Sequence, residues 1–238
     1  MPTFNRRAYV PSAVRYFLSQ DYDRKELLVF DDGDESVADL MPGDSRVRYF
    51  RLDRRTVLGE KRNLACEEAR GEIIAHWDDD DWMAPWRLRH QIGELLDQNA
   101  DACGVDHLFF YQPEKDLAWC YFYEKGGRRW IAGGTLCYKK AFWRSNPFPA
   151  VSIGEDTRFV WADHGGRVLA HSDYSFYVAM IHRGNTSPKV TSSLRYHPHS
   201  ASEVRRMIGE DLEACAGVGF DERQRRARER AMRMEALQ

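Results

Sequence analysis

The residues best suited to do chemistry are four consecutive aspartates, Asp78 to Asp81, which directly follow the apolar run 72–77. Two carboxylates about 4 Å apart repel each other by about 4 kcal/mol at an effective dielectric constant of about 20, so the cluster needs a cation, an arginine or protonation. Side chains two positions apart share one side of an extended chain, which makes Asp78 and Asp80 candidate ligands of Mg²⁺ or Mn²⁺. The alternative is an acidic solvated loop, or a helix start ahead of Pro85.

A second acidic segment, Asp31–Asp32–Gly33, follows another predicted strand, residues 26–30. Ligands of open α/β sheets bind at the carboxyl ends of the strands, so we expect both acidic segments to face one crevice. Taken in isolation, Asp32–Gly33 would be explained better as an ordinary turn.

Three further groups of polar residues are candidates for a site. Lys61 and Arg62 lie at the start of a predicted helix and could meet a phosphate or a base edge, although a salt-bridged surface is the default for such a pair. Glu155 and Asp156 begin another helix, where capping is the simpler explanation from the residues alone. His182 ends the last predicted strand and could ligate a metal or phosphate, or serve the structure.

Short apolar runs alternate with longer amphipathic ones, a pattern that predicts an α/β fold. Paired glycines, Gly133 and Gly134, interrupt one strand-like run and indicate a close backbone approach. Antiparallel pairing is expected in the second half of the chain. Helices are predicted over 7–20 (capped by Asn5), 58–69, from Pro85 onward with Leu96 on its apolar side, and 155–162, and strands over 26–30, 47–52, 72–77, 102–111, 117–123, 130–138, 167–170 and 175–181.

Composition limits the possible functions. The 238 residues suit one domain, here residues 1–188, followed by a polar tail over 189–238 that ends in a charged helix. A net charge of -2 gives no basic field for nucleic acid, and no apolar run approaches the ~20 residues of a membrane span. The polar start predicts a cytoplasmic protein. Five widely spaced cysteines argue against a disulfide framework or structural zinc.

Residues 1–189 resemble the family 2 glycosyltransferases, which have the GT-A fold, invert the anomeric centre and use nucleotide-diphosphate sugars. PTFNR is similar to their opening nucleotide loop, DDG to their base contact, LGEKRNLACEEARGEIIAHWDDDDWMAP to the stretch leading into the DxD motif, and GEDTRF to the ED motif. Four motifs in the family's order are more specific than any one of them. The implied fold is a Rossmann-like, mostly parallel mixed sheet flanked by helices, with a C-terminal helical tail.

The resemblance also implies roles for individual residues. It assigns the catalytic base to Asp156 within the Glu155–Asp156 pair, and a divalent cation, Mn²⁺ or Mg²⁺, to the DxD segment. The nucleotide contacts would be Pro2, Thr3, Asn5, Asp31, Asp32, Lys61, Arg62 and Asp79, the metal ligands Asp78, Asp80 and His182, and the acceptor side Gly133 and Gly134.

Two departures from the family pattern matter. The chain starts inside the opening loop, so the apolar first strand is expected to be missing. No Gln precedes Arg129–Trp130 at the place required by the QxxRW motif of processive members, which favours single transfer of a hexosyl-like sugar to a glycan, lipid or protein hydroxyl. The alternatives are a nucleotidyltransferase, which would be expected to open with a Gly-rich triphosphate loop, and a non-catalytic nucleotide- or sugar-binding remnant.

Overall fold

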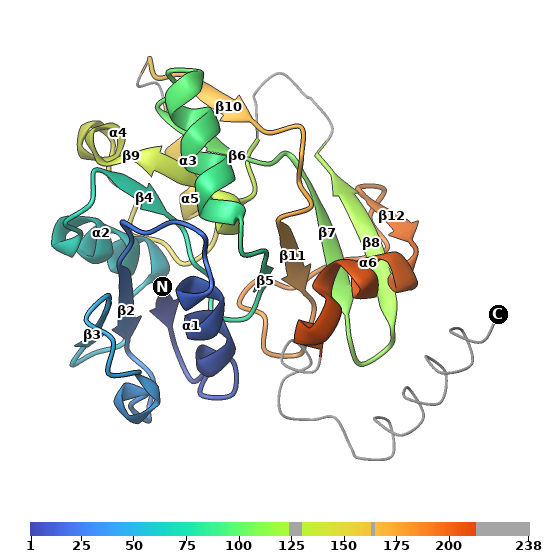
Figure 1. Cartoon of the computed structure of the whole chain (residues 1–238), viewed down its shortest axis with the longest axis horizontal. Helices are drawn as coiled ribbons and strands as arrows, with labels where there is room; N and C mark the ends of the chain where they lie inside the picture. The colour runs from blue at the N-terminus through green and yellow to red at the C-terminus, as the bar shows by residue number, and fades with distance from the viewer. Residues whose placement is uncertain (124–129, 163–164, 213–238) are drawn as a thin grey trace.

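The structure, a computed structural model, describes residues 1–123, 130–162 and 165–212. Three sheets and the helices packed on them form a mixed α/β fold (Figure 1). The first sheet contains β1 (Pro2–Thr3), β2 (Leu27–Asp31) and β3 (Val47–Arg51), the second β4 (Ile73–Ala75), β6 (Ala102–Gly104), β9 (Cys137–Lys139) and β10 (Val168–Ala170), and the third β5 (Trp82–Met83), β7 (His107–Gln112), β8 (Leu117–Phe122), β11 (Tyr177–Met180) and β12 (Tyr196–His199). The helices are α1 (Val10–Leu18), α2 (Leu58–Glu68), α3 (Arg87–Asp97), α4 (Lys140–Ser145), α5 (Glu155–Trp161) and α6 (Ala201–Ile208), with 3-10 turns η1 (Ala38–Leu40), η2 (Gly133–Thr135) and η3 (Gly209–Asp211).

The first sheet is parallel throughout. Its central strand, β2, is buried at all five residues and pairs with β1 on one side and β3 on the other. Thr3 is opposite Asp31 in the register, so the carboxyl ends of β1 and β2 reach the same edge of the sheet. Helix α2 packs on β1 and β2. The predicted strands 26–30 and 47–52 are thereby confirmed, with ends that differ by one residue.

Antiparallel strands join parallel ones in the second and third sheets, as expected for the second half of the chain. The predicted strand 102–111 was wrong as one element, because it divides into β6 in the second sheet and β7 in the third. The predicted strand 130–138 divides as well, into η2 and the short strand β9. With three sheets and several antiparallel pairs, parallel pairing is less dominant than the sequence predicts.

Two details of the predicted helices were wrong. Asn5 does not cap α1, whose N-cap is Tyr9; the Asn5 backbone has a φ of 55°, and its side chain exchanges hydrogen bonds of 2.7 Å with Asp34. Leu96, expected on the apolar side of α3, is 56% exposed. Helix α3 otherwise buries Leu88, Ile92 and Leu95 against the second sheet.

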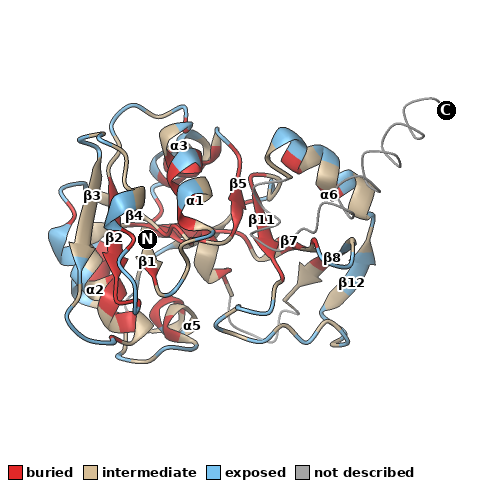
Figure 2. Cartoon of the chain, turned by 90° about the horizontal axis from the view of Figure 1, so that it is seen from below, coloured by how far each residue is buried: buried red, intermediate tan, exposed pale blue. Residues whose placement is uncertain are grey.

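Part of the predicted polar tail belongs to the fold. Strand β12 pairs with β8, and the next helix, α6, packs on β7 and β8 with Val204 and Ile208 buried (Figure 2). A boundary at residue 188 therefore does not separate a packed part from an unpacked part. The sequence underestimated this segment because its strand is short and contains Pro198 between two histidines. The predicted charged helix at 221–238 lies outside the described residues.

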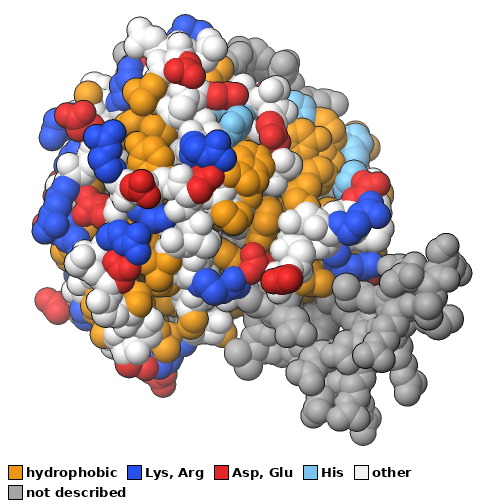
Figure 3. Space-filling model, viewed as in Figure 1, with side chains coloured by type: hydrophobic (Ala, Val, Ile, Leu, Met, Phe, Trp, Pro, Cys, Tyr) orange, Lys and Arg blue, Asp and Glu red, His pale blue; other side chains and the backbone are white. Residues whose placement is uncertain are grey.

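Basic and acidic side chains are interspersed on the molecular face drawn in Figure 3.

Within the ranges that the structure describes, no helix combines the length and apolarity that a membrane span requires. Cys66, Cys103, Cys120 and Cys137 are buried free thiols, and Cys215 lies outside the described residues.

The packing of α6 makes a prediction about stability. Ile208 is 3% exposed, so Ile208→Ala should lower the free energy of unfolding by about 2–5 kcal/mol, through lost burial and a cavity. Leu194, which is 89% exposed, provides the control, since Leu194→Ala should change the free energy of unfolding by less than about 0.5 kcal/mol. Urea denaturation would measure both, and equal midpoints for the two variants would contradict the integration of α6 into the core.

Candidate active site

A cavity of about 760 Å³ lies at the ends of β1 and β4, bordered by η2 and by the start of α5. Its size falls in the range of small-molecule and cofactor sites, about 300–1,000 Å³. All of the residues predicted for the site line this cavity except Asp31, Asp32 and His182. Those that line it are Pro2, Thr3, Asn5, Lys61, Arg62, Asp78, Asp79, Asp80, Gly133, Gly134, Glu155 and Asp156.

The four aspartates occupy different environments. Asp80 Oδ2 lies 2.9 Å from His182 Nε2 and 3.5 Å from the Arg6 guanidinium. Asp81 is held by the protein itself: its carboxylate accepts hydrogen bonds from the Tyr177 hydroxyl and, at 2.8 Å, from the Met180 N–H. Asp80 is thus placed for ligands, whereas Asp81 anchors the acidic segment to β11.

Burial and mutual repulsion shift the pKa values within this run. Burial, reinforced by the charge of Asp80, raises the pKa of Asp79 to about 7. Burial also raises the pKa of Asp81 well above its usual value, with Asp80 and Asp78 adding to the effect. Burial acts in the same direction on Asp80, but the hydrogen bond from His182 and the charge of Arg6 outweigh it and leave the pKa of Asp80 lowered. A negative charge is therefore concentrated on Asp80.

Arg62 links the acidic run to α5. Its guanidinium is 3.6 Å from Asp78 and 3.2 Å from Glu155, and the arginine is 7% exposed. Burial raises the pKa of the Glu155 carboxyl, although Arg62 opposes that shift. The contact engages Glu155, so its neighbour Asp156 is the better candidate for a reacting carboxylate.

The paired glycines leave room for three side chains at the cavity wall, those of Asp156, Tyr177 and Asp78. A Cβ atom on Gly133 would overlap the Asp156 carboxylate, and one on Gly134 would overlap the Tyr177 hydroxyl and lie 2.6 Å from Asp78 Oδ2. The close approach predicted from the sequence is confirmed, and what approaches the glycine backbone is side chains from three other segments.

Asp31 and Asp32, which were predicted to contact the nucleotide, do not line the cavity. The Asp31 carboxylate is fully buried and accepts hydrogen bonds from Gly33 N at 2.8 Å, Val37 N at 3.0 Å and the Tyr49 hydroxyl at 2.8 Å. Burial raises its pKa, but these bonds together lower it. Asp31 therefore stabilises the turn after β2 instead of facing a ligand.

Asp32 serves as the counter-ion of a buried lysine. Lys61 Nζ lies 2.5 Å from Asp32 Oδ1 and donates to Thr3 O at 3.0 Å. Arg55 and the Thr56 N–H also contact the Asp32 carboxylate, at 3.0 and 2.7 Å. Lys61 therefore lines the cavity while the Asp32 carboxylate neutralises its charge.

Sequence analysis missed several residues of the site. Arg6 adjoins the predicted Asn5, and its place within PTFNR was a usable signal. Tyr177 lies in a predicted strand, where nothing distinguished it from a core residue. Arg87 is fully buried and donates at 2.9 Å to His76 O and at 2.8 Å to Gly134 O. It thereby fixes the turn η2, which contains Gly133 and Gly134 and is called the glycine turn below. An arginine near a helix start gives no sequence signal for such a contact.

The donor atoms at the acidic run fit a divalent cation. Asp80 and His182 offer an oxygen and a nitrogen 2.9 Å apart, and the Asp78 side chain, 27% exposed, also lines the cavity. Carboxylate oxygens suit Mg²⁺ and Mn²⁺, and an added imidazole suits Mn²⁺ better than Mg²⁺. Asp80 and His182 lie together, whereas Asp78 does not join them in a group of three ligand atoms within 4.8 Å of one another among the described residues, so the predicted set of Asp78, Asp80 and His182 stays a prediction.

Comparison with known proteins identifies the family. Residues 1–148 match the sequence profile described as glycosyl transferase family 2. The chain belongs to this family. The resemblance noted from its motifs is confirmed.

Curated relatives of this glycosyltransferase-family chain come from several bacteria. It is 30% identical over 101 residues to an uncharacterized glycosyltransferase of Haemophilus influenzae, covering 40% of each chain. It is 32% identical over 116 residues to the GalNAc(5)-diNAcBac-PP-undecaprenol beta-1,3-glucosyltransferase of Campylobacter jejuni, covering 46% of this chain and 35% of that protein. The alignments thus span well under half the length of these relatives.

Solved structures share the fold of this family member at low sequence identity. Staphylococcus aureus TarS 1-349 in complex with UDP-GlcNAc superposes with a TM-score of 0.60 at 16% identity, covering 90% of this chain and 70% of that one. The mannosyltransferase PcManGT of Pyrobaculum calidifontis, in complex with GDP-Man and Mn²⁺, gives 0.56 at 18% identity, covering 90% and 67%. These likenesses support the GT-A fold expected from the sequence.

The Lys61–Asp32 pair makes a prediction about stability. Lys61→Met leaves the Asp32 carboxylate buried without its nearest cation, and should lower the free energy of unfolding by about 3 kcal/mol or more. Lys139, whose half-buried pair with Asp101 spans 3.2 Å, is the control, and Lys139→Met should lower the free energy of unfolding by less than about 1 kcal/mol. Chemical denaturation measures both, and a near-neutral Lys61→Met would show that the pair contributes little to the fold.

Proposed function

We propose that the chain catalyses single, inverting, metal-dependent transfer of a sugar from a nucleotide diphosphate to an acceptor hydroxyl. The observation that carries the proposal is the placement of two distinct carboxylates, Asp80 and Asp156, on the wall of one cavity. One is paired with an imidazole and suits a cation, and the other lies at a glycine turn and suits a proton acceptor.

The donor would occupy the part of the cavity next to β1 and the acidic run. Pro2 and Thr3 border it at the strand end, and Lys61, Arg62 and Arg6 supply positive charge near the position of a diphosphate. Bound at Asp78, Asp80 and His182, a divalent cation would neutralise charge on the leaving diphosphate. The complexes of TarS with UDP-GlcNAc and of PcManGT with GDP-Man make these two donors the first to test.

The acceptor would enter beside Gly133 and Asp156. Asp156 Oδ1 accepts a hydrogen bond of 2.7 Å from the Thr157 N–H, and a Cβ at Gly133 would overlap Oδ2. The carboxylate is thus held at the turn, where it can take the proton from an attacking hydroxyl. Attack opposite the leaving group requires one such base and inverts the anomeric centre, and general-base catalysis is typically worth about 10² to 10⁴-fold in rate.

The missing Gln of the QxxRW pattern supports a single transfer instead of processive synthesis. A nucleotidyltransferase is less well supported, because no Gly-rich triphosphate loop precedes α1 in the sequence. A binding remnant would retain nucleotide affinity without turnover, so the experiments below separate it from an enzyme.

Nucleotide binding should depend on the cation. UDP or GDP with Mn²⁺ should raise the melting temperature more than the same nucleotide with EDTA, since a ligand at 100 times its Kd stabilises by about 2.7 kcal/mol. Asp80→Asn should abolish the Mn²⁺-dependent part of the shift. Asp53→Asn, a substitution outside the cavity lining, is the control and should keep it. Equal shifts with Mn²⁺ and with EDTA would remove the cation from the proposal.

Substitution of the base should separate binding from chemistry. Asp156→Asn keeps the shape of the side chain but removes the proton acceptor, so it should lower kcat by about 10² or more with little change in nucleotide affinity. Glu60→Gln alters a carboxylate in the first turn of α2, outside the cavity lining, and should leave kcat unchanged.

Release of nucleoside diphosphate from the donor that binds best would report turnover. Gly154 is the N-cap of α5, and Asp156 accepts a hydrogen bond from Thr157 N in the first turn, so wild-type turnover by Asp156→Asn would show that the residue serves only the structure of that turn. Nucleotide binding by the wild type without any turnover, on water or on a panel of sugar acceptors, would favour the binding remnant.

A further inference from the structure

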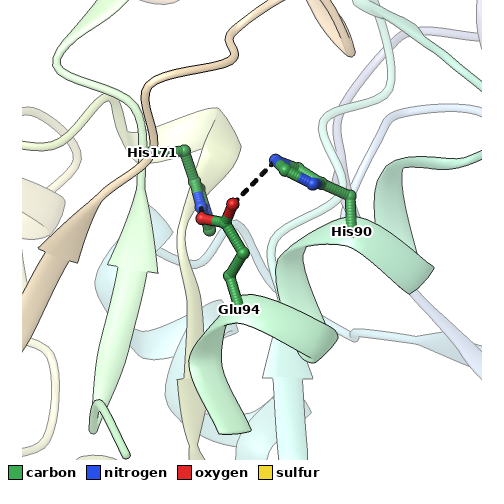
Figure 4. A group of neighbouring side chains, drawn as sticks. All are labelled: His90, Glu94 and His171. Atoms are coloured by element: carbon green, nitrogen blue, oxygen red, sulfur yellow. Dashed lines mark hydrogen bonds and ion pairs between the residues drawn. The ribbon is translucent and has the colours of Figure 1, made fainter. Parts of the chain in front are cut away.

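A cluster of two histidines and one glutamate lies away from the cavity, between α3 and the segment that follows β10. His90 and Glu94 are one turn apart on α3, and His171 comes directly after β10 (Figure 4). The three side chains point toward one another, and one potential ligand atom from each lies within 4.8 Å of the others. None of the three lines the cavity of the proposed active site.

Two buried nitrogens of this cluster, Nε2 of His90 and Nε2 of His171, form no hydrogen bond among the described residues, although His90 Nε2 lies 3.9 Å from Glu94 Oε1. The His171 side chain is fully buried, and its other nitrogen, Nδ1, is 2.5 Å from Glu94 Oε2. An unsatisfied buried polar atom costs about 1–3 kcal/mol, so a ligand that engaged both nitrogens would remove that cost.

The chemistry of the cluster favours a transition metal. Two imidazoles with one carboxylate form a donor set typical of Zn²⁺, whereas Mg²⁺ and Ca²⁺ prefer oxygen ligands alone.

The surroundings of the cluster are suited to hold such an ion. The ring of Phe176 lies 5.6 Å from that of His90 and 5.9 Å from that of His171, and Trp86 packs 5.5 Å from His90. These aromatic rings limit the orientations of the imidazoles and the access of water. Asp173, held by the Ser175 N–H and hydroxyl at 2.9 and 2.7 Å, adds a second negative charge near both histidines.

We propose that His90, Glu94 and His171 form a zinc-binding site that ties α3 to the segment after β10, separate from the cation site at the acidic run. The ion would accept one nitrogen from each histidine and an oxygen from Glu94, leaving room for a water ligand. Because α3 also carries Arg87, which holds the glycine turn, the bound ion would fix the helix that supports the cavity from behind.

The test uses the untagged full chain, which is first stripped of metal with EDTA and freed of the chelator. Zinc is then added back, and the zinc bound to the protein is measured. Wild type and Asp80→Asn should each bind one equivalent of zinc at this cluster. Glu94→Gln and His90→Gln should bind that zinc at least about 100-fold more weakly than wild type, because the loss of a ligand should cost at least as much affinity as the loss of a contact that supports a ligand. Co²⁺ in place of Zn²⁺ should give visible absorption bands in wild type that these two variants lack.

A matched control is available where the end of β12 meets α6. His199 Nε2 lies 3.0 Å from Glu203, and the two residues have the same i,i+4 spacing as His90 and Glu94. Among the described residues this pair has no third ligand beside it, so His199→Gln should leave zinc binding unchanged. Circular dichroism would verify that each variant is folded, and the Glu94 side chain, 39% exposed, makes Glu94→Gln the milder substitution.

Equal zinc binding by wild type and Glu94→Gln would overturn the proposal, as would loss of all zinc in Asp80→Asn. Failure of nucleotide binding or turnover would not affect this result, since the readout is the metal itself.

Discussion

The buried guanidinium of Arg62 holds together three segments that are far apart in the sequence. It comes from α2, and it contacts Asp78 after β4 and Glu155 at the start of α5. Burial lowers the pKa of an arginine, but Asp78, Glu155 and Asp156 together raise that of Arg62, so its charge is permanent. An isolated buried charge would be strongly unfavourable, and this one is stable only while both carboxylates face it. The geometry of the cavity wall depends on that balance.

The same principle explains how neighbouring acidic residues acquire different roles. Asp31 and Asp32 are adjacent, yet one closes a turn through backbone N–H groups and the other neutralises Lys61. Glu155 and Asp156 differ in a similar way, because only the first is engaged at short range by Arg62. A buried carboxylate takes its function from the donors that surround it, and those come from distant parts of the chain.

Much of the architecture was predictable because it is encoded locally. The five consecutive buried residues of β2 and the acidic run after β4 could both be located from short windows of sequence. The tertiary contacts between distant segments could not be located in that way. The division of 102–111 between two sheets, the pairing of β12 with β8, and the meeting of Glu94 with His171 across 77 residues all depend on tertiary contacts that no local pattern encodes.

The anchoring of Asp81 to β11 has a consequence for the acidic run. Its carboxylate accepts from Met180 N and from the Tyr177 hydroxyl, and Tyr177 and Val178 pair with Met83 and Trp82 of β5, immediately after the run. Four chemically identical residues therefore occupy positions that are fixed from their C-terminal end. Deleting one aspartate would leave three in the sequence, but each remaining carboxylate before the anchor would have to reach a place intended for its neighbour. The length of the run is thus constrained as strictly as its composition.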